Sequence, residues 1–483
     1  MRCAYPPYET GSVVGWIRRA ARSQGLGKAV ARAASTRGRA VPPKFGIAGR
    51  VPPPLADPRR GRKLEPIRGG GPRFRSPPPP AGSRESHPMT STLVSSRLSP
   101  LARRVEPFHV MRLLGRAAEL EAQGRSIVHL EVGEPDFPTP EPIVEAGRRA
   151  LADGRTRYTP ARGLAALRED LAGYYAGRYG VPVDPACILV TPGASGALQL
   201  VFQAVLEPGD RVLLCDPSYP CYRQVLRLLS VEPVAVPVGP QTSYQLTVDL
   251  AAEAWVPGVR AVVVASPSNP TGSSLDPAVM AGLHELCRAR GAAFIVDEIY
   301  QGLTYEAPDR TALTLGSEDL YVINSFSKYF GMTGWRLGWL VGPADAVSVM
   351  DRMAQNLFLA ANTPAQYAAR AALAPATRPI LDGRALAFRQ RRDRLLPALR
   401  ELGFGIPVAP TGAFYLYARL PERVTLDSMT LASRLLEEAG VALTPGHDFG
   451  FHAADRHVRF AYTREAADLD EGVRRIGDAL ARL

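Results

Sequence analysis

The chain has 483 residues, of which 46% are hydrophobic and 22% charged, so it can bury a large core and should hold two or three domains. Its formal net charge of +12 at pH 7 would favour a nucleic-acid or membrane partner if the charge were spread over the protein. Residues 1–88, however, carry 18 of the 58 lysines and arginines and 4 of the 46 acidic residues, which leaves 40 basic and 42 acidic residues in 89–483. Because this remainder is nearly neutral, we expect no nucleic-acid partner and no membrane partner.

The five cysteines are too few and too scattered for a disulfide framework. No Cys-x-x-Cys or His-x-x-x-His pair occurs, which argues against a zinc site, and we expect no metal. The longest apolar runs, such as the one around Val262–Ala265, fall far short of the roughly 20 residues that a membrane helix needs. These features predict a soluble protein of a reducing compartment, most simply the cytoplasm.

Residues 1–88 differ in composition from the rest of the chain. They contain 15 of the 45 prolines, a run of three glycines at 69–71 and many isolated arginines. Such a segment offers little apolar surface to offset the entropy of ordering, so we expect disorder. Three interpretations are open: a basic arm for an anionic partner, a transit peptide (Val13–Arg37 is rich in arginine and poor in acids), or a translation start at Met89 that leaves 1–88 outside the native protein. We favour the start at Met89, because an orderly, helix-forming segment follows it.

The chain after residue 98 alternates between helical and β-branched stretches. Apolar residues at helical spacing predict a helix over 99–122, which Gly124 would end, and 126–132 is expected to form a short strand. From about 140 to 370, helical stretches alternate with the runs Cys187–Thr191, Arg211–Cys215, Val234–Val238, Ala261–Ala265, Ala293–Val296, Leu320–Asn324 and Leu337–Val341. This alternation predicts an α/β fold whose large domain has a mostly parallel, seven-stranded sheet sandwiched by helices.

The last part of the chain has a different pattern. After about residue 372, a long helix over 384–402 gives way to shorter strands at Phe414–Arg419, Val441–Thr444 and His457–Tyr462. We therefore expect a smaller α+β domain built from 89–135 and 372–483, and a large domain over 136–371.

Polar residues follow several of the predicted strands. In open α/β sheets, ligands bind beyond the carboxyl ends of the strands. Pro192–Ala197 follows the first run with small residues, which let backbone N–H groups approach a phosphate at the start of a helix. Ser266–Gly272, Asp297–Tyr300 and Ser325–Lys328 follow three later runs, and Arg336 comes eight residues after the lysine. Together they place an amide, a carboxylate, a phenol, a lysine and an arginine at one edge of the sheet.

These motifs resemble those of the class I/II aminotransferases, the aspartate-aminotransferase-like, fold-type I pyridoxal-phosphate enzymes. Ser-Phe-Ser-Lys-x-Phe-Gly-Met-x-Gly-x-Arg runs from Ser325 to Arg336, and Asn-Pro-Thr-Gly and Asp-x-x-Tyr precede it at 269–272 and 297–300. The resemblance covers the chain from about Leu98 to its C-terminus. It implies pyridoxal 5'-phosphate as the cofactor and an amino acid and a 2-oxo acid as the substrates.

The resemblance implies three catalytic residues. Lys328 matches the lysine that forms a Schiff base with the cofactor and later moves the substrate α-proton, two roles that suit a neutral amine. Asp297 matches the carboxylate paired with the pyridine nitrogen, which keeps the ring an electron sink. Tyr300, together with Asn269, matches the pair that hydrogen-bonds the phenolic oxygen of the ring.

The resemblance also implies a phosphate cradle and a stacking partner for the ring. The residues that match the cradle are Ala194, Ser195, Ser325, Ser327 and Arg336. An arginine suits this place because its fork of donors fits phosphate oxygens. Tyr219 matches the aromatic residue that stacks on the cofactor ring, and ordinary core packing is the alternative role for it.

Further matches concern the substrate and the assembly. Arg459 matches the arginine that binds the substrate α-carboxylate with two hydrogen bonds, and Gly133 and Asn269 match positions that face the substrate. Tyr158 matches a tyrosine that reaches the cofactor phosphate of a neighbouring subunit. The resemblance therefore implies at least a homodimer with shared active sites.

The function implied is that of a pyridoxal-phosphate-dependent aminotransferase, which moves an amino group between an L-amino acid and a 2-oxo acid by a ping-pong mechanism. Because the same fold and cofactor serve other reactions, a carbon–sulfur β-lyase is an alternative. A cofactor-binding transcription regulator is less favoured, since residues 1–88 have no helix-turn-helix signature. The preferred amino donor stays open, because we can assign no second cation for a distal carboxylate.

Overall fold

The computed structural model describes residues 98–483 except 104, 307 and 317, and every structural statement below concerns these residues. The predictions made for residues 1–88 fall outside the described part of the chain. Within that part, no helix is both long enough and apolar enough to cross a membrane.

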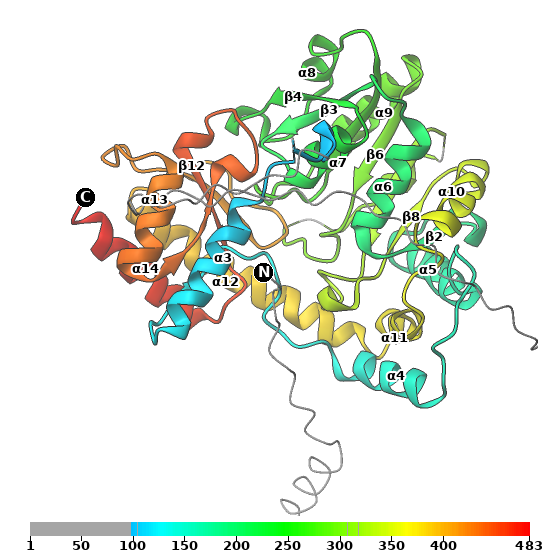
Figure 1. Ribbon diagram of the computed structural model, residues 1–483, viewed down its shortest axis with the longest axis horizontal. Helices are drawn as coiled ribbons and strands as arrows, with labels where there is room; N and C mark the ends of the chain where they lie inside the picture. The colour runs from blue at the N-terminus through cyan, green and yellow to red at the C-terminus, as the bar shows by residue number, and fades with distance from the viewer. Residues whose placement is uncertain (1–97, 104, 307, 317) are drawn as a thin grey trace, which may run out of the picture. The chain divides into compact units, whose positions relative to one another are not determined.

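A seven-stranded sheet lies at the centre of the larger group of elements (Figure 1). Its strand order is β2-β8-β7-β6-β5-β3-β4, and all neighbours are parallel except the pairs that β8 makes with β2 and β7. The strands are β2 Ile188–Thr191, β3 Arg211–Asp216, β4 Glu232–Pro237, β5 Val259–Ala265, β6 Ala293–Asp297, β7 Leu320–Ser325 and β8 Gly338–Val341. The predicted mostly parallel sheet is confirmed, and each predicted run overlaps one of these strands.

Helices cover both faces of this sheet, because its central strands are apolar on both sides. In β5, Val262 and Val264 belong to the core on one face, whereas Ala261 and Val263 belong to the core on the other. The first core takes buried residues from α5 (Ala165–Tyr179), α8 (Val248–Glu253), α9 (Pro277–Ala289) and α11 (Thr363–Leu373), and α4 (Glu141–Ala152) packs against α11. The second core takes them from α6 (Gly193–Val205), α7 (Pro220–Leu228) and α10 (Ala344–Leu357).

A smaller group of elements comes from the two ends of the described chain. It has an antiparallel sheet of order β11-β12-β9 and a parallel pair of β1 and β10. Its strands are β1 Val128–His129, β9 Tyr415–Arg419, β10 Val441–Ala442, β11 Thr444–Pro445 and β12 His457–Ala461, and its helices are α2 Pro100–Arg103, α3 His109–Ala122, α12 Arg378–Glu401, α13 Ser428–Arg434 and α14 Ala466–Leu480. The long helix α12 runs from beside α11 to beside α14 (Figure 1).

The helix predicted over 99–122 is wrong in its bounds, because α2 and α3 are separate helices. Pro107 lies between them, and a proline disfavours helix at the residue before it. The first N–H groups of α3, those of His109 and Val110, donate to the carboxylate of Asp448 at 2.7 and 2.8 Å. This cap is 339 positions away from His109, so no local pattern could indicate it.

Three other predictions are wrong in extent. The strand predicted over 126–132 contains only the two residues of β1, and the helix predicted over 384–402 begins at Arg378. The strand predicted at Val441–Thr444 divides into β10, which pairs with β1, and β11, which pairs with β12. The point where a chain passes from one sheet to another depends on the partner strands, which periodicity does not reveal.

Candidate active site

Polar residues gather at the edge of the seven-stranded sheet where β2, β5, β6 and β7 end. Asp297 ends β6, Ser325 ends β7, and Asn269 follows β5. Since β8 is antiparallel to both of its neighbours, β2 and β7 point the same way, and Ala194 therefore follows β2 at this edge. The topology thus brings together the segments that were expected to converge.

Lys328 follows β7 and is enclosed by residues from distant parts of the chain. Its amine donates a hydrogen bond to the carbonyl oxygen of Gly133 at 2.7 Å and lies 5.8 Å from the ring centroid of Phe414. Burial lowers the pKa of this amine from its ordinary value of 10.5 to about 8; the charge of Glu134 opposes this shift, and the charges of Arg459 and Arg336 add to it. A neutral, nucleophilic amine is therefore accessible near neutral pH.

Asp297 is a buried carboxylate with a donor on each oxygen. Its residue is 3% exposed, the hydroxyl of Tyr222 donates to Oδ2 at 2.6 Å, and the backbone N–H of Ile299 donates to Oδ1 at 3.0 Å. Burial raises the pKa of this carboxyl, while the two hydrogen bonds and the charge of Lys328 lower it. A carboxylate kept in such a place needs a cationic partner to remain ionised.

Arg459 reaches the site from β12 and is 5% exposed. One terminal nitrogen donates to Oδ1 of Asn269 at 2.9 Å, and the other donates to the backbone oxygen of Glu131 at 2.5 Å and the hydroxyl of Thr444 at 3.2 Å. No carboxylate of the described residues forms an ion pair with Arg459, and its Nε has no hydrogen-bond partner there. The site therefore presents a buried positive charge that an anionic ligand could neutralise.

Aromatic rings hold this arginine and the tyrosine of the predicted site in place. The guanidinium of Arg459 lies 4.3 Å from the ring centroid of Tyr415 and 4.8 Å from that of Phe449. The hydroxyls of Tyr300 and Tyr415 are 2.8 Å apart, and burial raises the pKa of Tyr300 well above its ordinary value. A Cβ on Gly133 would come within 1.8 Å of the Tyr415 hydroxyl, so only glycine lets that backbone approach so closely.

Many of the predicted site residues line a single cavity of about 220 Å³. The predicted site residues that line it are Gly133, Tyr219, Asn269, Asp297, Tyr300, Lys328 and Arg459. Much of its remaining wall is apolar, with Phe108, Val110, Met111, Ile299 and Phe449 among the lining residues. The described residues contain no group of three or more His, Cys, Asp and Glu side chains that could hold a metal ion.

The predicted phosphate cradle lies at the start of α6, at the same edge of the sheet. Gly193, with a φ of +72°, begins the helix, and a Cβ added to it would come 2.8 Å from a terminal nitrogen of Arg336. The hydroxyl of Ser325 donates to that of Ser327 at 2.9 Å, and both residues are buried. A helix start with free N–H groups beside a guanidinium is suited to a phosphate.

Three predicted residues are open to solvent. Ser195, in the first turn of α6, and Arg336 are exposed, and Arg336 donates to the backbone oxygen of Thr333 at 3.0 Å. Tyr158 is 84% exposed and does not line the cavity. The role expected for Tyr158 requires a second subunit, so it stays a prediction.

Sequence reasoning missed three residues of the site: Tyr222, Tyr415 and Phe449. Tyr222 binds Asp297, and its position three residues after Tyr219, across the start of α7, was a usable signal because such positions share a helix face. Tyr415 and Phe449 sandwich the arginine of β12, and nothing local distinguishes them from core residues.

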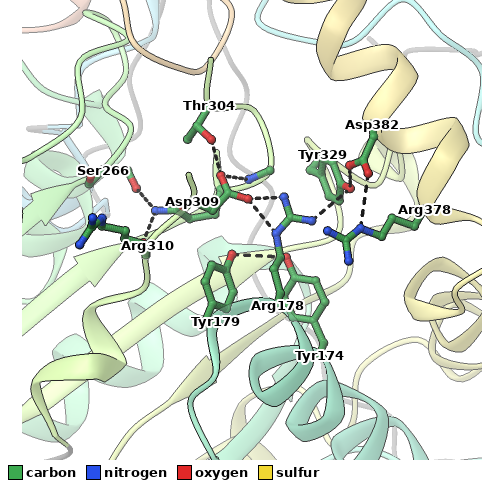
Figure 2. Close-up of polar contacts among 12 residues, drawn as sticks. Tyr174, Arg178, Tyr179, Ser266, Thr304, Asp309, Arg310, Tyr329, Arg378 and Asp382 are labelled. Carbon is green, nitrogen blue, oxygen red and sulfur yellow. Dashed lines mark hydrogen bonds and ion pairs between the residues drawn. The ribbon is translucent and has the colours of Figure 1, made fainter. Parts of the chain in front are cut away.

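A polar network centred on Arg178 includes Tyr329, the residue that follows Lys328 in the chain (Figure 2). Arg178 of α5 forms an ion pair with Asp309 and donates to the hydroxyl of Tyr329 at 3.3 Å, and Tyr329 donates to Asp382 of α12 at 2.5 Å. Asp309 also accepts from the backbone N–H of Gly302 at 3.1 Å. The network therefore ties the loop that follows Asp297 and the residue next to Lys328 to α5 and α12.

The comparisons with known proteins agree with this geometry. Residues 125–476 match the family model described as aminotransferase class I and II. The chain is 39% identical over 378 residues to the valine–pyruvate aminotransferase of Mycobacterium tuberculosis, which covers 78% of this chain and 97% of that protein. It is 36% identical over 387 residues to the aspartate/prephenate aminotransferase of Thermus thermophilus, covering 79% and 99%. A crystal structure of an aminotransferase from Mycobacterium tuberculosis superimposes with a TM-score of 0.77 at 38% identity, covering 80% of this chain and all of that one.

The chain belongs to the class I and II aminotransferases. Members of this family are pyridoxal-phosphate-dependent enzymes that transfer an amino group between an amino acid and a 2-oxo acid. The predicted family, fold class and aminotransferase function are therefore confirmed.

Proposed function

We propose that this chain binds pyridoxal phosphate at the cavity around Lys328 and uses it to transaminate amino acids with apolar side chains. One observation carries the proposal: a buried lysine with a pKa of about 8 shares a cavity with a buried carboxylate and a buried arginine that has no carboxylate partner among the described residues. Each of these three groups is costly to bury alone, and a ligand with complementary charges would relieve the cost.

The residues fit the chemistry of this cofactor. Asp297 offers a buried carboxylate for the pyridine nitrogen, and the start of α6 with Arg336, Ser325 and Ser327 offers donors for the phosphate. Tyr300 and Asn269 line the same cavity and offer hydrogen-bond donors for the phenolic oxygen, and Tyr219 presents a ring to the cavity. When bound, pyridoxal phosphate supplies an electron sink for the charge that develops at the amino-acid α-carbon.

The chain's own residues then have distinct tasks. Lys328 is the covalent attachment point for the cofactor aldehyde and, once displaced by the substrate, a base that takes the α-proton. Asp297 stabilises a proton on the pyridine nitrogen, and its hydrogen bond from Tyr222 keeps the carboxylate oriented. Arg459 holds the substrate α-carboxylate, since its guanidinium is fixed by Asn269, Glu131 and the two rings that flank it.

The wall of the cavity favours apolar side chains. Lys328 and Arg459 are the basic residues among those that line it, and both already have tasks. Among the described residues, the rest of the wall, which includes Phe108, Val110, Met111 and Phe449, offers no lysine or arginine for a distal carboxylate. The name of the Mycobacterium tuberculosis relative, a valine–pyruvate aminotransferase, supports the same class of donor.

Spectroscopy and peptide mapping test the cofactor site. Lys328 is the only lysine in residues 64–483. We expect the purified full chain to gain a visible absorption band with pyridoxal phosphate, and borohydride to fix the cofactor on the peptide that contains Lys328. Lys328→Ala should abolish both results, whereas Lys63→Ala, a matched control outside the described residues, should change neither. The absence of a band in the parent chain would refute the proposal.

Single amino acids, added without an oxo acid, test the reaction. L-Valine and L-alanine should convert the band and release the matching 2-oxo acid, and L-aspartate should act much more slowly. Preferential reaction with aspartate would overturn the apolar class while leaving the cofactor site intact. Release of pyruvate and ammonia from a cysteine or cystathionine substrate, with the band unchanged, would instead establish the β-lyase.

We further propose a homodimer that shares its active sites through Tyr158 and works in the cytoplasm by a ping-pong mechanism. The exposure of Tyr158 supports the first part, since it leaves the ring and hydroxyl accessible to a second subunit. The four described cysteines are unpaired, as expected in a reducing compartment. The division into a large domain over 136–371 and a small domain over 89–135 and 372–483 stays part of this proposal.

A further inference from the structure

A second cavity, of about 590 Å³, lies beside the antiparallel sheet that carries Arg459. Two buried tyrosines, Tyr244 and Tyr417, and the half-buried His457 form its floor, and the exposed Arg400, Arg419 and His452 stand at its rim. None of the residues that line it, all within the described part of the chain, is acidic. The cavity is therefore an electropositive concavity with an aromatic base.

The histidine of the floor is held in place by the backbone. Its Nδ1 lies 2.9 Å from the backbone oxygen of Ala453 and donates to it, and no described residue hydrogen-bonds its other ring nitrogen. Burial lowers the pKa of His457, the hydrogen bond to the backbone of Ala453 raises it, and the positive charges of Arg419 and Arg456 lower it. The lowered pKa favours the neutral ring, so the positive charge of the cavity comes from its arginines, Arg400 and Arg419, whose guanidinium groups suit an oxyanion.

The acidic side chains near the cavity already have hydrogen-bond or ion-pair partners. The carboxylate of Asp216 accepts from the backbone N–H groups of Phe451 and His452 at 3.0 to 3.3 Å. Glu422 pairs with Arg419 at 2.9 Å, but its side chain is 81% exposed, so solvent screens that pair. The remaining arginine, Arg400, donates to the backbone oxygen of Ile406. Among the described residues, the exposed Glu422 thus pairs with one arginine of the cavity, and Asp216 stays a nearby anion whose charge reaches Tyr417.

The floor of the cavity is suited to a planar, apolar ring of a ligand. The ring of His457 stacks on that of Tyr417, with centroids 4.8 Å apart and an angle of 7° between the planes. Tyr244 meets Tyr417 edge to face, with centroids 5.8 Å apart. A planar ring offered to this surface gains stacking contacts, and an oxyanion on that ring would reach the cations of the rim.

The second cavity is connected to the catalytic one through two short paths. In the register of β9 and β12, Tyr417 is directly opposite Arg459 and Arg419 is opposite His457, so these four side chains share one face of the sheet. Phe449 contacts the guanidinium of Arg459, and its ring lies 6.2 Å from that of Tyr417. A ligand that moves Tyr417 would therefore act on the contacts that hold Arg459.

We propose that this second cavity binds an aromatic oxyanion, a carboxylate or a phosphate ester on a planar ring, and that the bound ligand changes the affinity of Arg459 for the substrate carboxylate. The binding stands on the cavity itself. The effect on substrate rests on the function proposed above for Arg459.

Calorimetry on the full-length holoenzyme tests the binding. Benzoate and phenyl phosphate are the anionic probes, and benzamide is the uncharged control. The double variant Arg419→Gln/His452→Gln should bind the anionic probes at least about tenfold more weakly than the parent. Arg423→Gln, an exposed arginine outside the cavity, should bind them like the parent. Arg459→Lys should also retain them, because it alters only the catalytic cavity. Whichever probe binds more tightly identifies the carboxylate or the phosphate ester as the source of the oxyanion.

Three results would overturn the site: no binding at millimolar concentration, equal binding by the double variant, or benzamide binding as well as benzoate. Loss of binding in Arg459→Lys alone would do the same, because the probe would then occupy the catalytic cavity.

Steady-state kinetics tests the coupling. The probe should shift the KM for the amino acid at least about twofold in the parent and leave it unchanged in the double variant, whose activity without probe should match the parent's. Binding without a shift in KM would refute the coupling and keep the site. If the proposed function itself fails, no variant transaminates, yet the calorimetric differences persist.

Discussion

Lys328 combines two properties that the site exploits at the scale of a single residue. It is the only lysine in residues 64–483, and its amine is buried within reach of both cationic and anionic side chains. Burial disfavours the charged form, which brings the pKa to about 8. A base works best when its pKa lies near the working pH, so this environment prepares the amine for both covalent attachment and proton transfer.

The pH dependence of cofactor capture follows from this shift. Because the neutral amine is the reactive form, the rate at which the cofactor-free chain gains its absorption band should rise with pH, with a midpoint of about 8, and level off above it. An ordinary lysine would keep gaining reactivity up to about 10.5. Stopped-flow absorbance between pH 6 and 10 measures the profile. A rate still rising at pH 10 would show that the amine is not desolvated as the structure indicates.

The buried carboxyl group of Glu298 leads to a prediction about how the stability of the protein depends on pH. Its side chain is fully buried, one oxygen accepts from the backbone N–H of Ala312 at 2.6 Å, and the other has no hydrogen-bond partner among the described residues. Burial raises the pKa of this carboxyl from 4.5 to about 8. The folded state thus binds a proton that the unfolded state releases between these two values, so the contribution to stability is complete below about pH 4.5 and is lost as the pH rises through 8.

We therefore expect Glu298→Gln to become more stable than the parent as the pH rises from 6 to 9. Urea denaturation at each pH gives the two free energies of unfolding. Glu422→Gln, at an exposed carboxylate, should follow the parent throughout. A constant difference between Glu298→Gln and the parent would mean that the buried carboxyl does not titrate in this range.

At the scale of elements, the network around Arg178 decides how the two catalytic loops sit relative to each other (Figure 2). Asp309 fixes the loop after Asp297 through Gly302 and Thr304, while Arg178 and Asp382 fix Tyr329. A Cβ on Gly302 would lie 2.4 Å from the Tyr329 ring, so the two loops are in direct contact. The elements that carry Tyr300 and Lys328 are therefore positioned by one shared set of contacts.

Breaking this network should lower the free energy of unfolding more than breaking an ion pair on the surface. The side chains of Arg178 and Asp309 are 14% and 6% exposed, and removing one partner of a buried pair costs about 3–5 kcal/mol, because the other charge is left buried and unpaired. Arg178→Gln should therefore lower the free energy of unfolding by that amount. Arg474→Gln on α14, whose side chain is 60% exposed, should change it by less than about 1 kcal/mol. Equal, small effects in urea denaturation would show that the network adds little to stability.

At the scale of the whole molecule, the shared active site can be tested by mixing inactive chains. If Tyr158 serves the neighbouring subunit, Lys328→Ala and Tyr158→Ala chains should each be impaired as homodimers. Their hybrids would contain one intact site, so random reassembly should restore about a quarter of the parent activity. Reassembly after mild denaturation, with light scattering to confirm the dimer, measures this. No recovery in confirmed hybrids would place Tyr158 in its own subunit's site or outside any site.

The sequence by itself predicted the seven-stranded sheet and its parallel character, because runs of β-branched residues separated by helical stretches have few other solutions. It also predicted which strand ends carry polar groups. Lys328, Asp297 and Asn269 could be picked out for this reason, since parallel strands bring their carboxyl ends to one edge. The roles assigned to these residues remain proposals that rest on the family resemblance.

Only the tertiary structure decided which residues surround those groups. Tyr415 and Phe449 enclose Arg459 because β9, the loop before β12 and β12 fold against one another, and Asp448 caps α3 from the other end of the described chain. The lowered pKa of Lys328 likewise depends on burial by distant segments. Local periodicity encodes which face of an element is apolar, whereas contacts, burial and electrostatics arise only when elements from distant parts of the chain meet.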